Sequence, residues 1–195
     1  MRSVTVYCSS STALEPHFAT TARAVGAELA RRGLVLVYGG GSIGLMGEAA
    51  RAAKAAGGRV EGIITQQLLD LEQGWTGCDE MIVVGTMRER KRLLEERGDA
   101  FLILPGGLGT YEEVFEILVG RYLQNHAKPI GVVNDHGYYD PMIAMIDHGI
   151  EHKFIRPAVK DLLRIDADPL RAIAFLLAPP DRSVSLGDCL PMGGR

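Results

Sequence analysis

The sequence predicts one α/β domain over residues 1–178, a Rossmann-like parallel sheet with helices on both faces. The first observation is that β-rich apolar runs alternate along the chain with segments of helical spacing, an order typical of a parallel sheet. The second is that runs such as residues 34–38 are almost continuously apolar, as expected for strands buried on both faces. With 195 residues, 47% of them hydrophobic, the chain can bury one substantial core.

Each element follows from its local pattern. Strands are expected at residues 3–8, 34–38, 59–64, 80–84, 101–104 and 129–133, where apolar and β-branched side chains concentrate. Helices are expected at residues 16–32, 43–56, 87–97, 109–124, 138–150 and 168–178, where apolar side chains recur at helical spacing. The last segment, residues 179–195, is rich in Pro, Gly and Ser and is predicted to be a disordered tail.

The composition argues against several classes of protein. The net charge of −3 and the pI near 6.0 come without a basic block, so we expect neither nucleic acid nor a membrane as a partner. No apolar run approaches the roughly 18 residues that a membrane-spanning helix needs. The three cysteines are far apart and no signal peptide is recognisable, which favours reduced thiols and a cytoplasmic protein.

A glycine-rich turn at residues 105–113, with the sequence PGGLGTYEE, is the most informative segment. It follows a predicted strand and opens onto a predicted helix, so backbone N–H groups at the helix N-terminus are free to bind a phosphate. The same segment ends with two adjacent carboxylates, Glu112 and Glu113. A phosphate site has no need of acids beside it, whereas chemistry on the attached sugar would use them.

A second glycine-rich turn, GGGSIG at residues 39–44, follows the second predicted strand. Gly39, Gly41 and Gly44 match the dinucleotide pattern GxGxxG, and Glu61 lies further along the chain. Because the turn follows the second strand rather than the first, and Glu61 lies within its strand, we favour a contact with a mononucleotide phosphate over NAD. The alternative, that these glycines only allow close packing of a helix against a strand, stays open at this point.

Basic side chains crowd the start of the helix expected at residues 87–97. Thr86 can cap this helix. Four cations lie near its positive end: Arg88, Arg90, Lys91 and Arg92. Cations there oppose the helix dipole, which indicates an anionic ligand. The alternative is a solvated charged face in which they pair with glutamates of the same helix.

Together these segments resemble the LOG ("lonely guy") family, the cytokinin riboside 5′-monophosphate phosphoribohydrolases that are often mislabelled lysine decarboxylases. The resemblance rests on PGGLGTYEE at residues 105–113, on MRERK at 87–91, and on GGG and GLMG within 39–47. It covers residues 3–155, and GVVN at 131–134 and GYY at 137–139 are similar to later family segments. It implies hydrolysis of an N6-modified adenosine 5′-monophosphate to free base and ribose 5-phosphate.

The resemblance implies roles for the matching residues. The catalytic pair of the family falls on Arg90 and Glu113. We expect Glu113 to stabilise positive charge on the ribose, and Arg90 to act electrostatically because a pKa above about 12 makes arginine a poor acid. The residues implied in substrate binding are Ser9, Gly39, Gly40, Gly41, Glu72, Met87, Lys91, Gly106, Gly107, Gly109, Thr110 and Glu112. Ser9 departs from the family, which usually has glycine there.

We expect no cofactor and no metal. The histidines show no spacing typical of metal ligands; they are His17, His126, His136, His148 and His152. LOG-like proteins are dimers, so the resemblance also implies a homodimer. Two alternatives stay open, a general nucleosidase for purine 5′-monophosphates and a non-catalytic nucleotide carrier or sensor. Lysine decarboxylation would need a pyridoxal phosphate lysine, and nothing in the sequence marks one.

Overall fold

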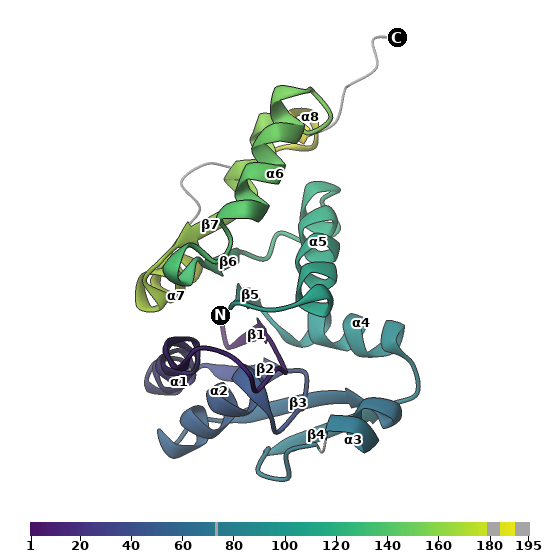
Figure 1. Cartoon of the computed structure of the whole chain (residues 1–195). Helices are drawn as coiled ribbons and strands as arrows, with labels where there is room; N and C mark the ends of the chain where they lie inside the picture. Colours follow the sequence, from purple (N-terminus) through teal and green to yellow (C-terminus); the bar gives the residue numbers. More distant parts are fainter. Residues whose placement is uncertain (73, 179–183, 190–195) are drawn as a thin grey trace.

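The computed structural model describes residues 1–72, 74–178 and 184–189. Within them, one sheet of 7 parallel strands has the order β4-β3-β2-β1-β5-β6-β7 (Figure 1). The strands are β1 (Ser3–Tyr7), β2 (Val35–Tyr38), β3 (Val60–Thr65), β4 (Glu80–Val84), β5 (Ala100–Ile103), β6 (Ile130–Val133) and β7 (Leu163–Asp166). The predicted fold class is therefore confirmed.

Helices cover both faces of the sheet. One face carries α1 (Pro16–Arg31), α2 (Gly44–Ala55) and α7 (Pro169–Leu177), and the other carries α4 (Met87–Arg97), α5 (Leu108–Tyr122) and α6 (Asp140–Glu151). Shorter helical segments are α3 (Gln66–Glu72), η1 (Asp135–Gly137), η2 (Pro157–Leu162) and α8 (Leu186–Cys189). None of the helices in the described part of the chain combines the length and apolarity that crossing a membrane requires.

The core has two apolar layers because strand side chains alternate between the faces of the sheet. In β1, Val4 and Val6 belong to the layer beneath α1 and α2, whereas Tyr7 belongs to the layer beneath α4 and α5. In β5, Leu102 and Phe101 divide between the layers in the same way. Burial on both faces explains why the strand segments are almost continuously apolar in sequence.

The structure contains elements that the sequence pattern does not predict, namely α3, η1, η2, β7 and α8. The sheet accordingly has 7 strands, and the expectation of six is wrong. β7 is an edge strand of 4 residues, of which Leu163 and Ile165 are apolar, and so short an alternation carries little signal. Within the tail predicted to be disordered, α8 is described; the other tail residues lie outside the described part of the chain, and for them disorder stays a prediction.

The strand order creates a crevice beside β1. The chain passes from β1 through β2 and β3 to the edge strand β4, and then returns to β5 on the other side of β1. In open parallel sheets, ligands bind at the carboxyl ends of the strands where the order reverses. The loops that follow β1, β2 and β5 therefore meet at one edge, which we call the carboxyl edge.

Candidate active site

A pocket of about 370 Å³ opens at the carboxyl edge. Its size falls within the range of about 300–1,000 Å³ that is common for small-molecule sites. The residues predicted from sequence that line it are Ser9, Gly39, Arg90, Gly107, Gly109, Thr110 and Glu113. The fold thus brings both predicted catalytic residues into one pocket with several of the predicted binding residues.

The glycine turn before α5 forms one wall of the pocket. Gly107 is the N-cap of α5 and provides no side-chain cap, so the first amides of the helix, those of Leu108, Gly109 and Thr110, have no partner within the helix. A Cβ on Gly107 or Gly109 would meet no other atom within 4 Å, because these positions face open space. Free amides at a helix N-terminus, together with the helix dipole, suit a phosphate.

The second glycine turn is explained largely by packing. The N–H groups of Leu45 and Met46, at the start of α2, donate to the carbonyl of Ser9 at 2.9 and 3.4 Å. Gly44 has φ 59°, and a Cβ there would lie 2.4 Å from the carbonyl carbon of Ser10. The start of α2 is therefore capped by the loop after β1, and the packing alternative accounts for Gly44.

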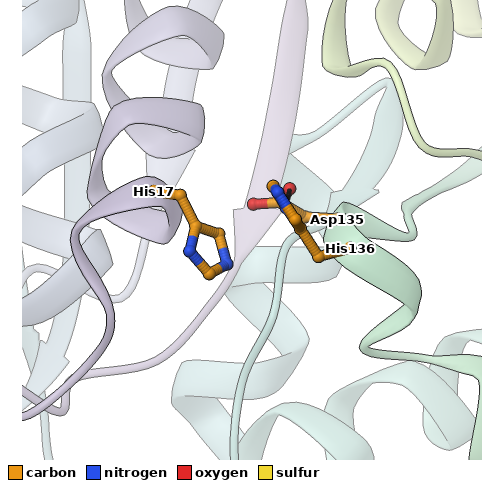
Figure 2. A group of neighbouring side chains, drawn as sticks. All are labelled: His17, Asp135 and His136. Carbon is orange, nitrogen blue, oxygen red and sulfur yellow. Dashed lines mark hydrogen bonds and ion pairs between the residues drawn. The ribbon is translucent and has the colours of Figure 1, made fainter.

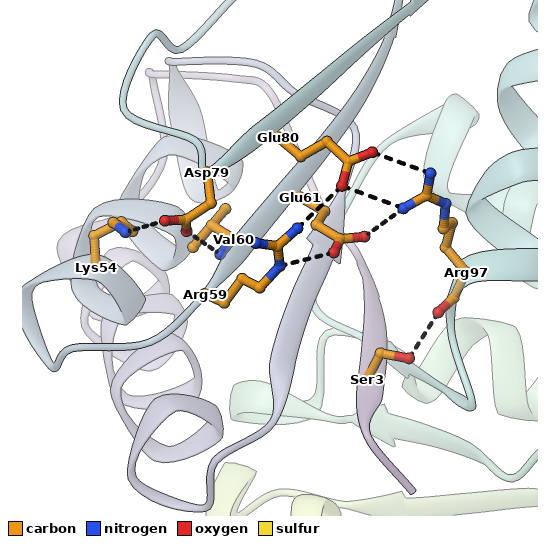
Figure 3. A network of polar contacts seen from close by, with 8 residues as sticks. All are labelled: Ser3, Lys54, Arg59, Val60, Glu61, Asp79, Glu80 and Arg97. Atoms are coloured by element: carbon orange, nitrogen blue, oxygen red, sulfur yellow. Dashed lines mark hydrogen bonds and ion pairs between the residues drawn. The ribbon is translucent and has the colours of Figure 1, made fainter.

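Glu61, the acid that a dinucleotide site would require, lies away from the pocket. It stands near the start of β3, at the amino edge of the sheet, and pairs with Arg59 and Arg97 at 3.0 Å each. Both arginines also pair with Glu80 (Figure 3). A carboxylate held in this network cannot reach a ribose at the opposite edge, so the geometry gives NAD binding no support.

Arg90 is held rigidly beside the pocket. It lies on α4, whose first turn is capped by the hydroxyl of Thr86 as the sequence predicts. Its Nε donates to the carbonyl of Ile63 at 3.0 Å and its Nη2 donates to the carbonyl of Gly39 at 3.2 Å. A Cβ on Gly39 would lie 2.2 Å from Nη2, so glycine makes room for the guanidinium. Only 7% of Arg90 is exposed.

Glu113 enters the pocket from the second turn of α5, half-buried. Burial raises the pKa of its carboxyl to about 7, the nearby charge of Arg90 lowers it in part, and the neighbouring Glu112 raises it further. A carboxyl that titrates near neutrality can exchange protons at physiological pH, which is typical of catalytic acids and bases.

Lys91 and Glu112 bind each other in this structure and do not line the pocket. The Nζ of Lys91 lies 2.8 Å from Glu112 and 3.0 Å from Glu116, which raises the pKa of the lysine, chiefly through the hydrogen bond to Glu112. These pairs tie α4 to α5 immediately beside Arg90 and Glu113. Direct binding of substrate by Lys91 and Glu112 stays a prediction.

Gly40 and Gly41 support the pocket from behind rather than lining it. The carbonyl of Gly40 accepts a hydrogen bond from the N–H of Trp75 at 3.0 Å, and Gly41 forms an isolated bridge with Gly74. Gly40 has φ 79°, which favours glycine. These two glycines anchor the segment after α3.

Two further predicted binding residues contact side chains that line the pocket. Gly106 packs against Thr110, where a Cβ would lie 2.1 Å from the threonine Oγ1. The Sδ of Met87 lies 3.5 Å from Nη1 of Arg90. Glu72 is the last residue of α3, but its side chain lies outside the described part of the structure, so its role stays a prediction.

Ser9 replaces the family's usual glycine without backbone strain. Among the described residues other than glycine, positive φ occurs at Gln124, His136 and Lys153, and Ser9 is not one of them. The N–H of Ser9 donates to the carbonyl of Pro105 at 3.1 Å, which ties the loop after β1 to the loop after β5.

Two tyrosines that sequence reasoning did not place in the site hold the glycine turn. The hydroxyl of Tyr138 donates to the carbonyl of Gly106 at 2.5 Å, and that of Tyr139 donates to the carbonyl of Leu104 at 2.7 Å. Buried tyrosines need a partner for the hydroxyl, so the pair of aromatics after β6 is a usable signal. The sequence does not reveal which carbonyls accept, because they lie more than 30 residues away.

Comparisons with known proteins agree with this geometry. The family model described as "Possible lysine decarboxylase" matches residues 46–176. A cytokinin riboside 5′-monophosphate phosphoribohydrolase from Rhodococcoides fascians is 40% identical over 179 residues, covering 91% of this chain and 90% of that protein. One from Mycobacterium tuberculosis is 40% identical over 174 residues, covering 88% and 92%. LOG5 from Arabidopsis thaliana is 41% identical over 159 residues, covering 82% and 70%.

Solved structures support the fold. The molybdenum cofactor carrier protein of Chlamydomonas reinhardtii superposes with a TM-score of 0.69 at 23% identity, covering 91% of this chain and 99% of that one. At this identity the likeness concerns the fold alone. Because the family model spans most of the chain and relatives about 40% identical align with nearly all of it, the chain belongs to the LOG family of cytokinin riboside 5′-monophosphate phosphoribohydrolases.

Proposed function

We propose that this protein hydrolyses the N-glycosidic bond of an N6-modified adenosine 5′-monophosphate, releasing the free base and ribose 5-phosphate and so activating a cytokinin. The observation that carries the proposal is one pocket lined by free helix amides, a buried arginine and a carboxyl of near-neutral pKa. The names of the relatives that are about 40% identical support the same activity.

The 5′-phosphate would bind at the start of α5. The amides of Leu108, Gly109 and Thr110 would donate to its oxygens, and the helix dipole would favour its charge. Glu113 lies four residues beyond Gly109, about 6 Å further along the helix axis. This spacing leaves room for the ribose between the phosphate and the carboxyl group.

Glu113 would act on the ribose. Cleavage of the bond between C1′ and the base nitrogen builds positive charge on the sugar, and an ionised carboxylate stabilises that charge. The same carboxylate can take a proton from the attacking water, whose oxygen bonds to C1′. The proton is then returned to the leaving nitrogen, so the base departs neutral and the carboxylate is regenerated.

Arg90 would act through its fixed charge. The carbonyls of Ile63 and Gly39 hold the guanidinium in one orientation, and an arginine stays protonated throughout catalysis. It would hold the nucleotide and stabilise the negative charge that develops on the leaving nitrogen before this nitrogen receives its proton. Arg90 is also the principal group that lowers the pKa of Glu113, so it keeps more of that carboxyl ionised.

The direct test is to incubate the purified protein with AMP and, separately, with N6-isopentenyl-AMP, and to measure the free base by chromatography. Preferential release from the modified nucleotide is expected. Equal or preferential release from AMP would favour a general purine nucleosidase instead. Binding of both nucleotides without any release would favour a carrier or sensor.

We also propose that the protein is a homodimer. Apolar side chains that remain exposed on and after α5 support this, with Val119 50% exposed and Leu123 43% exposed. Sedimentation analysis of the wild type and of Val119→Asp would test it. A wild-type monomer would overturn the proposal, whereas a dimer that the substitution dissociates would place α5 at the interface.

We propose a cytoplasmic location as well. The support is the low number of cysteines, 3 in the whole chain, and the free thiols of Cys8 and Cys78. Fractionation of the native source, with the protein detected by an antibody, would test it, and recovery in a secreted fraction would contradict it.

A further inference from the structure

A cluster of metal-ligand side chains lies outside the pocket. His17 comes from the first turn of α1, and Asp135 and His136 come from η1, directly after β6. Figure 2 shows the ring of His17 reaching across toward the other two residues. One ligand atom from each residue can be chosen so that all three lie within 4.8 Å of one another. The fold thus unites residues whose sequence spacing gives no hint of a site.

Asp135 is a buried carboxyl group beside His17 and His136. It is 5% exposed, and its side chain forms hydrogen bonds with the hydroxyl of Thr21 at 2.8 Å and with Nδ1 of His136 at 2.6 Å. Within the described part of the chain, no lysine or arginine forms an ion pair with it. Buried carboxylates are usually paired with a cation or coordinate a metal. A cation bound beside Asp135 would therefore fit this environment.

His17 provides an unused ligand atom beside that carboxylate. Its Nε2 is buried and has no hydrogen-bond partner among the described residues. Its ring lies 4.1 Å from that of His136, measured between centroids. A buried imidazole nitrogen without a partner is uncommon and needs an explanation. Coordination of a metal ion is one, because imidazole is a frequent ligand of transition metals.

We propose that His17, Asp135 and His136 bind a divalent transition-metal ion, with Zn²⁺ as the best match. Two imidazoles and one carboxylate form a donor set that Zn²⁺ accepts, with a fourth position left for water. The ion would take the place of the direct hydrogen bond between Nδ1 of His136 and Asp135. The hydroxyl of Thr21 would hold the second carboxylate oxygen and orient the ligand.

The bound ion would join two segments that support the pocket. It would connect the start of α1 to the loop after β6, and this loop carries Tyr138 two residues after His136. Tyr138 in turn donates to the carbonyl of Gly106 in the glycine turn. Because the ion binds the folded state, it would raise the thermal stability of the protein.

A second histidine pair on the surface must be removed before the test. His148 lies in the last turn of α6 and His152 is the C-cap of this helix, next to Glu151; all three side chains are exposed. These exposed side chains would bind added Zn²⁺ at the surface and would obscure binding at the proposed site. The variant His148→Ala/His152→Ala therefore serves as the background for every measurement.

The experiment is a calorimetric titration of Zn²⁺ into this background protein after treatment with a chelator. We expect one Zn²⁺ per chain, and loss of that binding when His17→Ala or His136→Ala is added. Asp135→Asn keeps an acceptor for Thr21 while removing the charge, so it should weaken binding in a protein that still folds. Circular dichroism and a thermal melt confirm folding of each variant.

Two results would overturn the proposal. One is a background protein that binds no Zn²⁺, and the other is unchanged binding in folded His17→Ala and His136→Ala variants. Titration with Mg²⁺ gives a further check, because hard cations prefer all-oxygen sites. Binding of Mg²⁺ as tight as that of Zn²⁺ would contradict the choice of Zn²⁺ as the bound ion.

Discussion

The two edges of the sheet use charged side chains in opposite ways. At the amino edge, Arg59 and Arg97 each pair with both Glu61 and Glu80, at 3.0 to 3.1 Å (Figure 3). Every charge in this network has two partners of opposite sign, and the network connects β3, β4 and the end of α4. Charge at this edge serves the structure.

At the carboxyl edge, Arg90 and Glu113 share a pocket, and within the described residues neither forms an ion pair. Arg90 is instead held by backbone carbonyls. Burial disfavours the ionised form of Glu113 and raises the pKa of its carboxyl to about 7. Charges that are left unneutralised in a pocket are typical of catalytic sites, and they lower stability in exchange for reactivity.

A single helix, α4, contributes an arginine to each edge of the sheet. α4 carries Arg90 in its first turns and Arg97 as its last residue, so one element reaches both edges. The difference between the two arginines lies in their surroundings rather than in their chemistry. Substitutions at matched positions on the two edges should therefore separate activity from stability.

The largest effect is expected for Glu113→Gln. Loss of the carboxylate should lower kcat by about 100- to 10,000-fold, the usual contribution of a general acid or base. The fold and the binding of AMP should be retained, because glutamine has nearly the same shape. Base release under single-turnover conditions and calorimetry with AMP would measure the two properties.

Glu116→Gln is the matched control on the same helix. Its carboxylate is 48% exposed and pairs with Lys91 outside the pocket. Base release should stay close to that of the wild type. Retained turnover in Glu113→Gln, or an equal loss in both variants, would refute the role assigned to Glu113.

Arg90→Ala should lower kcat/KM by about 100- to 1,000-fold, as is usual when one electrostatic stabiliser is removed. Arg97→Ala should leave kcat/KM unchanged and lower the free energy of unfolding by about 1 kcal/mol, because its ion pairs are partly exposed. Steady-state kinetics and urea unfolding of both variants would measure this. A loss of activity in Arg97→Ala as large as in Arg90→Ala would contradict the claim that the amino edge serves stability and the carboxyl edge serves activity.

The pH dependence of kcat/KM reports the state of Glu113 in the free enzyme. If the carboxylate is the active form, kcat/KM should rise by about tenfold per pH unit up to the pKa of about 7 and then level off. A rate that falls as the pH rises through 7 would assign the protonated form instead. The kcat/KM of Glu116→Gln should show the same rise with pH as that of the wild type.

Gly109→Ala should weaken nucleotide binding without harming the fold. A Cβ at Gly109 would meet no protein atom within 4 Å but would face the bound phosphate, so KM should rise by about tenfold, in the range of one lost hydrogen bond to a charged group. Gly106→Ala is the contrasting change, since its Cβ would press on Thr110 and lower stability. Thermal melts and KM values for both variants would check this. An unchanged KM in Gly109→Ala would show that the phosphate does not bind at the start of α5.

The smallest effect concerns stability. The folded-state pKa of Glu113, about 7, lies above its usual value of 4.5, so the folded state binds the extra proton. The stabilisation this gives is present below about pH 4.5 and is lost as the pH rises through 7. Glu113→Gln should thus be more stable than the wild type at pH 8, by about 1 kcal/mol after solvent screening, and similar at pH 5. Urea unfolding at both pH values would measure this, and no gain at pH 8 would contradict the raised pKa.

Sequence reasoning predicted the turn and the helix that carry Glu113 because the relevant residues are contiguous, while the catalytic role of Glu113 stays a prediction. The motif at 105–113 contains both the helix N-terminus and Glu113, and a strand followed by glycines and a helix can form few other structures. It was less successful with GGGSIG at 39–44, where the same glycine spacing serves either phosphate or packing. The choice depends on the carbonyl of Ser9, which reaches α2 from another loop.

Residue type and spacing alone determined the fold class, the capped start of α4 and the segments that carry Arg90 and Glu113, because these depend on local periodicity and turn chemistry. Tertiary structure decided which charges are neutralised. Lys91 pairs with Glu112, while Arg90 beside it faces the pocket, although both are cations of one motif. Burial, pKa and the meeting of His17 with η1 depend on distances between segments that are remote in sequence, and only packing of the whole chain sets those distances.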